Sequence, residues 1–178
     1  MPVAGADRFL WLSNEAPPRG FREVPASGFC VCAFLFVRRG ADILLGKYAE
    51  DPRWESLTGL DPERVRVHAQ GWTVPASHLV FGEDPGKAGR RIAEAILGLP
   101  GLGMTEPRVE ASFEVHPRFP HRGHHYDIWF FLEARVPDGT EVARPPWYRE
   151  LSWQDPAKLP DGAYARSHGD VVARWLGR

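Results

Sequence analysis

The pattern of apolar residues along the chain predicts mostly strands. Residues 29–37 form an unbroken apolar and β-favouring run, as expected of a strand buried on both faces, and residues 43–48 follow it after a turn at Arg38-Arg39-Gly40. Further strands are predicted at 65–68, 72–75, 108–115, 126–136 and 147–154. Residues 49–66 contain two Asp-Pro steps and a Thr-Gly step, which predict a loop.

Residues 84–97 give the clearest helical pattern. Asp84 is a suitable N-cap, Pro85 suits the first turn, and Gly98 followed by Pro100 stops the helix. Apolar residues recur every three or four positions and so predict one buried face. These residues are Ala88, Ile92, Ala95, Ile96 and Leu99. A second helix is expected at 169–176, near the end of the chain.

Composition and charge narrow the class of protein. The chain has 178 residues, 43% of them hydrophobic and 25% charged, which fits one globular domain at 28–178 after an N-terminal arm at 1–27. The net charge of −1 provides no general attraction for a nucleic-acid polymer. Because no apolar run reaches the length of a membrane helix and no signal segment is evident, we expect no membrane partner and a cytoplasmic location.

Cys30 and Cys32 are the two cysteines, and their alternate spacing places them on one face of the first strand. A metal or redox site usually has further Cys or His residues at set spacings. We therefore expect both thiols to pack as small apolar side chains.

One stretch of sequence resembles the box of the Nudix hydrolase family, G-x5-E-x7-R-E-U-x-E-E-x-G-U with a W-x-L-P lead-in. The residues that carry the resemblance are Trp72-Thr73-Val74-Pro75, Ser77 at the opening glycine, Glu83, Arg91, Gly98 and Leu99. Residues 29–48 and 148–159 are similar to the family's first strands and to its late strand with the following turn. The resemblance implies an α/β fold, the Nudix-type α/β/α sandwich with a mixed sheet between helices.

The resemblance also shows which residues have been replaced. In the family, three glutamates of the box bind the divalent cation; here their positions hold Ile92, Ala95 and Ile96. Aliphatic side chains cannot ligate a hard cation. We therefore expect no catalytic residues, no metal ligands and no cofactor at this box. Glu94 lies about 200° around the helix from position 92, so we expect a solvated charge or an ion pair with Arg90 or Arg91.

Glu83, Arg91 and Gly98 match framework positions of the box. Their retention predicts that the geometry of the loop and helix is kept. Ala76-Ser77 replaces the usual glycine pair, and a Cβ there is expected to disturb the loop if its backbone needs positive φ or a close approach to a phosphate.

A second feature is the histidine-rich loop 116–125. Its metal-binding candidates are His116, His121, His124 and His125 with Asp127, although their spacing matches no known motif. Surface histidines are the simplest interpretation. A third interpretation is contact with an anionic ligand through Arg118, Arg122 and neighbouring histidines such as His124 and His125, with stacking on Tyr126 or Phe119. Trp72 and Trp54 are further candidates for contact with this ligand, but core packing is the stronger expectation for each.

Three functions remain open from the sequence. The leading hypothesis is a relative of the hydrolases of nucleoside-diphosphate-linked substrates that lacks metal-dependent hydrolysis and binds a nucleotide-like or phosphorylated small molecule. An alternative is an active hydrolase that holds Mg²⁺ or Mn²⁺ through Glu83 and residues outside the box, such as His78 or Glu114. The third is a structural subunit of a homodimer, suggested by the aromatic N-terminal arm and the apolar helix face.

Overall fold

A mixed sheet forms the centre of the molecule. A computed structural model describes residues 29–80, 82–115 and 124–178. The strands are β1 (Phe29–Arg39), β2 (Asp42–Tyr48), β3 (Ala76–His78), β4 (Arg108–Val115), β5 (His124–Arg135) and β6 (Tyr148–Gln154). Their order is β4-β5-β1-β2-β6, and β3 also pairs with β1. Since β1 and β5 are parallel while the other pairs are antiparallel, the sheet is mixed, as predicted.

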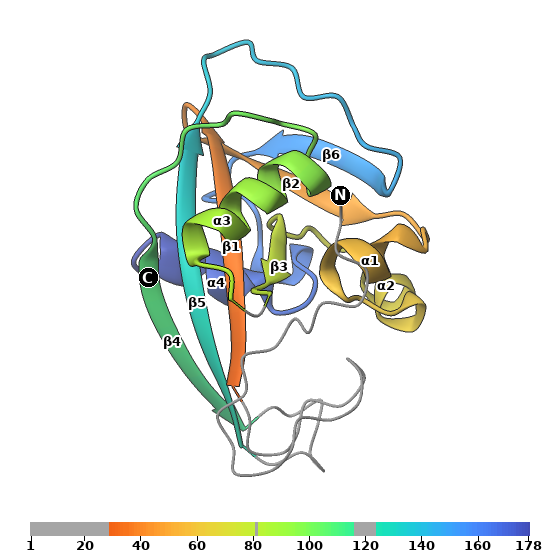
Figure 1. The fold of residues 1–178 in the computed structure, drawn as a ribbon. Helices are drawn as coiled ribbons and strands as arrows, with labels where there is room; N and C mark the ends of the chain where they lie inside the picture. The colour runs from red at the N-terminus through yellow and green to blue at the C-terminus, as the bar shows by residue number, and fades with distance from the viewer. Residues whose placement is uncertain (1–28, 81, 116–123) are drawn as a thin grey trace.

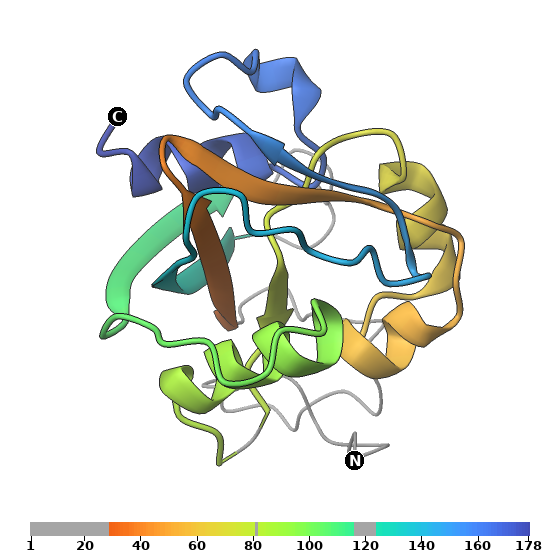
Figure 2. The same ribbon diagram turned by 90° about the horizontal axis from the view of Figure 1, so that it is seen from above.

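Helices lie on both sides of this sheet. They are α1 (Arg53–Thr58), α2 (Pro62–His68), α3 (Pro85–Arg91), the π-helical turn η1 (Ile92–Ile96), the 3₁₀ turn η2 (Asp161–Ala163) and α4 (His168–Trp175). Figure 1 shows α3 in front of β1 and β5 and α4 behind them, and Figure 2 shows the same layers from above. The arrangement is the predicted sandwich. None of the described helices has the length and apolar character needed to cross a membrane.

Two apolar cores fill the space between the sheet and the helices. The α3-side core contains Val31, Ala33, Leu35 and Val37 of β1 together with residues of α1, α2, α3 and η1. The α4-side core contains Phe34 and Phe36 of β1 with Val171 and Val172 of α4. Because successive residues of a strand face opposite sides, β1 contributes to both cores. This confirms the prediction of a strand buried on both faces.

The segment predicted as a loop and a strand, 49–68, is instead largely helical. Gly59 ends α1 at a φ of 81°, and the Asp61 carboxylate caps α2 by accepting a hydrogen bond from the Arg64 N–H at 2.9 Å. The Asp-Pro steps were interpreted as loop signals, but Asp61-Pro62 forms an N-cap followed by proline at the first helical position. The prediction of a strand at 65–68 was therefore wrong.

The predicted strand at 72–75 is also shorter than expected. Trp72 and Thr73 form isolated bridges with Tyr164 and Gly46, and the regular pairing with β1 begins only at Ala76. The predicted helix at 84–97 is present, with Asp84 as its N-cap and Pro85 as its first residue. It ends through η1 at Gly98, whose φ is 69°. The predicted closing helix corresponds to α4.

Gly46 of β2 allows the close approach of Tyr148. A Cβ added at Gly46 would lie 2.2 Å from Cε1 of the Tyr148 ring. That ring is 1% exposed and packs edge-on against Trp54, so it has little room to move. We expect Gly46→Ala to lower the free energy of unfolding by about 2 kcal/mol through overpacking, as measured by urea denaturation. Gly162→Ala, where an added Cβ meets nothing within 4 Å, is the control, and equal stability of the two variants would contradict this packing.

Candidate functional site

The loop before α3 and the end of α3 meet through Glu83 and Arg91. Asp84 and Pro85 start the helix directly after Glu83, and the Asp84 carboxylate accepts a hydrogen bond from the Lys87 N–H at 2.8 Å. Arg91 lies eight positions after Glu83, which is about two helical turns, so the Arg91 side chain faces back to the loop. The local helix signals therefore place the two side chains together.

Arg91 forms a forked ion pair with Glu83. Its Nε and Nη2 donate to the two carboxylate oxygens of Glu83, each at 2.8 Å. The remaining donors reach the Ser77 hydroxyl at 3.0 Å and the His78 carbonyl at 2.9 Å. The Arg91 and Glu83 side chains are 22% and 12% exposed, so solvent screens this pair only in part. Arg91 thus ties β3, the loop and α3 into one unit.

Both oxygens of the Glu83 carboxylate accept structural hydrogen bonds. Besides Arg91, it accepts a hydrogen bond from the Val80 N–H at 3.0 Å. At the same junction, Ser77 lies in β3 with extended backbone, and its hydroxyl is used by Arg91. Within the described ranges, positive φ at non-glycine residues occurs only at Arg166 and Ser167. The backbone at Ser77 therefore has no positive φ that would require glycine, and its Cβ does not strain the loop in that way.

The three positions of the box glutamates face or border the protein interior. Ile92 and Ile96 are 0% exposed and belong to the α3-side core, and Ala95 is partly buried. The Trp147 indole N–H donates to the Ile96 carbonyl at 2.9 Å and covers the end of η1. Side chains at these positions offer no oxygen for Mg²⁺ or Mn²⁺, so the residues present do not fit the cation that the family binds here. Glu94 is exposed, as predicted, while Arg91 pairs with Glu83.

Among the described side chains, the structure does not bring together Glu83 and His78, two of the ligands considered for an active hydrolase. Glu83 is held by Arg91, whereas the His78 ring contacts Cys30 on β1 at 2.8 Å. Neighbouring residues of β3 face opposite sides, so Ser77 points to Arg91 and His78 points away from it. The Glu114 side chain lies outside the described part of the structure.

The residues predicted to contact a ligand are not gathered at one described place. Trp72 is 8% exposed and packs in the α4-side core, with the Lys47 ammonium 4.1 Å from the centre of its ring. Trp54 is 1% exposed and donates to the Trp147 carbonyl at 2.9 Å. Both placements favour the packing interpretation. Arg118 lies outside the described residues, as do the side chains of His124, His125 and Tyr126, whose backbone begins β5.

A polar contact made by the segment just before α4 was not anticipated from the sequence. Arg166 donates to the Tyr48 hydroxyl at 3.0 Å, and its φ of 57° is strained for a residue with a Cβ. Burial lowers the pKa of Arg166, but Tyr48 and the Cys32 and Cys30 thiols outweigh this effect and raise it. The run Tyr164-Ala165-Arg166-Ser167-His168 before α4 was the available sequence signal.

His168, two positions after Arg166, is buried in the interior. It is 3% exposed, and its Nδ1 accepts a hydrogen bond from the Val74 N–H at 2.9 Å. Burial, followed by the charges of Arg166 and His68, lowers its pKa well below the usual value for histidine. The ring is therefore neutral near pH 7 and acts as an acceptor that fixes the residues before β3.

Comparison with known proteins identifies the fold but not a close relative. No family model matches the sequence, and no curated protein matches it. Solved structures do match it over most of its length. An Ap4A hydrolase from C. elegans aligns with 83% of this chain and 96% of its own, at 15% identity and a TM-score of 0.52.

Two bacterial or archaeal structures give the same result. The Nudix hydrolase RenU from M. smegmatis aligns with 94% of this chain and 93% of its own, at 18% identity and a TM-score of 0.52. A MutT protein from Methanosarcina mazei aligns with 83% of this chain and 92% of its own, at 14% identity and a TM-score of 0.53. The mixed sheet between helices, with α3 after the loop that contains Glu83, is thus the fold of the Nudix hydrolases.

Proposed function

We propose that this chain is a Nudix-family protein that binds a nucleotide-like or otherwise phosphorylated small molecule and does not perform the metal-dependent hydrolysis typical of the family. The observation that carries the proposal is the complete burial of Ile92 and Ile96 at two of the three positions of the box glutamates. A hard divalent cation requires oxygen ligands, and these positions now contribute to the apolar core.

The retained ion pair supports binding rather than loss of the whole site. Glu83 and Arg91 still fix the loop against α3, and both carboxylate oxygens of Glu83 accept hydrogen bonds within this network. A loop held in this way can keep the shape of a binding surface after the cation site has been lost. An Ap4A hydrolase shares this fold, and this supports a ligand of the nucleotide class.

Residues in the range 118–126 supply the candidate contacts for the ligand. Arg118, His124 and His125 are suited to charge-assisted hydrogen bonds with phosphate oxygens, and Tyr126 can stack on a base. These contacts need no bridging cation. Binding is therefore expected to persist when divalent cations are removed.

Calorimetry with ADP-ribose in EDTA tests this expectation. We expect binding with a Kd on the order of 10 µM, about tenfold weaker in Arg118→Ala because a charge-assisted bond is lost. Arg90→Ala is the matched control, since Arg90 is exposed on α3, and it should bind as the wild type does. Assays of phosphate and nucleotide products with Mg²⁺, Mn²⁺ or Zn²⁺ should show no turnover above the blank.

Several results would contradict the proposal. Turnover of ADP-ribose or Ap4A with Mg²⁺ or Mn²⁺ would establish an active hydrolase, and so would micromolar Mn²⁺ binding that Glu94→Gln abolishes. Absence of binding at millimolar concentrations of ADP-ribose and of Ap4A would favour the structural subunit instead. Sedimentation of the same sample then tests that role, because a clean monomer would exclude a homodimer subunit.

A further inference from the structure

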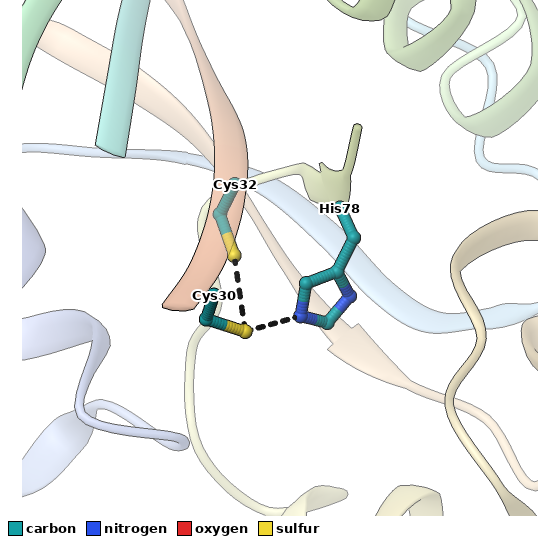
Figure 3. A group of neighbouring side chains, drawn as sticks. All are labelled: Cys30, Cys32 and His78. Atoms are coloured by element: carbon teal, nitrogen blue, oxygen red, sulfur yellow. Dashed lines mark hydrogen bonds between the residues drawn. The ribbon is translucent and has the colours of Figure 1, made fainter. Parts of the chain in front are cut away.

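Strands β1 and β3 bring two thiols and an imidazole together. The Cys30 sulfur lies 2.8 Å from Nε2 of His78 and 4.0 Å from the Cys32 sulfur, and Figure 3 shows the three side chains turned toward one another. Their potential ligand atoms all lie within 4.8 Å of each other. Cys30 is buried, while Cys32 and His78 are partly buried. The cluster is therefore at the border between the interior and solvent.

The register of the sheet creates this cluster. Cys32 is directly opposite His78 in the antiparallel pair of β1 and β3. Residues directly opposite one another face the same side of the sheet, and Cys30 shares that side because it lies two positions along β1. The grouping is thus fixed by backbone pairing and not by flexible side chains alone.

We propose that Cys30, Cys32 and His78 bind one Zn²⁺ ion. Thiolate sulfur and imidazole nitrogen are the preferred protein ligands of zinc. With Zn–S bonds of about 2.3 Å, two thiolates on a tetrahedral zinc lie roughly 3.8 Å apart, close to the observed separation of the sulfurs. Three protein ligands leave the fourth position for water or a ligand group, an arrangement found in catalytic zinc sites.

The geometry of the strand favours a metal over a disulfide. Residues two apart on one strand have Cβ atoms roughly 6.7 Å apart, from a rise of about 3.3 Å per residue. A disulfide needs its Cβ atoms at about 3.8 Å, so Cys30 and Cys32 could form one only by distorting β1. A metal ion spans the longer distance without this distortion.

The surrounding charge is compatible with zinc. Arg166 lies close enough to Cys30 and Cys32 for their ionised thiols to raise its pKa. Two thiolates neutralise the two charges of Zn²⁺, so the occupied site has no net charge to repel the guanidinium. The zinc site also does not depend on the function proposed above, because Glu83 and Arg91 contact the opposite side of β3 through Ser77.

Metal titration of the full-length protein tests the site directly. After removal of metal by a chelator under reducing conditions, Zn²⁺ is titrated in competition with a chromophoric indicator, and Co²⁺ is titrated with recording of the absorption spectrum. We expect one ion per chain, a zinc Kd below about 1 µM, and a cobalt spectrum with thiolate charge-transfer bands and intense tetrahedral bands. Bound zinc should also protect both thiols of the wild type from alkylation, a result that needs no variant.

Variants assign the ligands. Cys32→Ser and His78→Gln should each weaken zinc binding at least 100-fold, the upper end of what loss of a supporting residue costs at such sites. His68→Gln is the matched control, because His68 belongs to α2 and not to the cluster, and it should leave the affinity unchanged. Circular dichroism checks that each variant is folded.

Three outcomes would overturn the proposal. The first is no cobalt or zinc binding by the reduced wild type at 100 µM metal, roughly a hundred times the expected Kd. The second is unchanged affinity in folded Cys32→Ser and His78→Gln. The third is isolation of the native protein with Cys30 and Cys32 joined in a disulfide. Binding of ADP-ribose is measured separately in EDTA, so failure of either proposal leaves the other open to its own test.

Discussion

Replacing Ile92 by glutamate should lower the free energy of unfolding by about 4 kcal/mol or more at neutral pH, although it restores the residue type that the Nudix box has at this position. Ile92 is 0% exposed and packs in the α3-side core. A carboxylate placed there without a partner costs about 4 kcal/mol or more, which is a large part of the roughly 5–15 kcal/mol that stabilises a typical domain. Urea denaturation followed by tryptophan fluorescence and circular dichroism measures the loss.

Ala95→Glu is the control on the same turn. Ala95 is partly buried, so a longer side chain can reach solvent, and we expect its stability to remain within about 1 kcal/mol of the wild type. A folded Ile92→Glu protein that binds Mn²⁺ would contradict both this prediction and the proposed loss of the box cation site. The comparison therefore tests whether these positions still line a site or now belong to the core.

Replacing Arg91 by methionine should lower the free energy of unfolding by about 3 kcal/mol. The change removes the forked pair and leaves the Glu83 carboxylate, 12% exposed, with the Val80 N–H as its remaining partner from this network. Removal of one partner of a largely buried pair is costly because the other charge is left without compensation. The Ser77 hydroxyl and the His78 carbonyl lose a donor as well.

Arg90→Met is the matched control for this experiment. Arg90 is the exposed neighbour of Arg91, so its loss should change stability by less than about 0.5 kcal/mol. A double-mutant cycle with Glu83→Gln isolates the energy of the pair, and the two changes should be strongly non-additive. Additive effects would mean that Glu83 and Arg91 do not act together in holding the loop to α3.

Local signals in the sequence were sufficient for most of the architecture. The long apolar run at β1 and the cap and stop residues around 84–98 each carry a strong local preference, and the structure agrees with both. The helices α1 and α2 were missed because they are short and their apolar residues show no clear helical period. In such segments, tertiary packing decides the conformation: Trp54 packs against Tyr48 and against Tyr148, which is far away in sequence.

The two candidate sites differ in the same way, because one depends on local spacing and the other on the pairing of distant strands. The contact of Glu83 with Arg91 follows from helical spacing, so the resemblance to a known motif was enough to select both residues. The grouping of His78 with Cys30 depends on the pairing of β1 with β3, which joins segments almost fifty residues apart. The spacing of these residues in the sequence does not indicate this pairing. The cysteines were therefore expected to be simple core residues.

The parallel pairing of β1 with β5 also has a consequence for folding. Ten aligned residues join the two strands, from Phe29 opposite Tyr126 to Arg38 opposite Arg135, and each pair is roughly 100 residues apart in sequence. Contacts of such long range slow folding. During synthesis, β1 is among the first parts of this domain to leave the ribosome. Its partner β5 emerges only after most of the chain has been made. During that interval the nascent protein carries an apolar strand with an unpaired edge, which favours aggregation. We therefore expect chaperones to assist its folding.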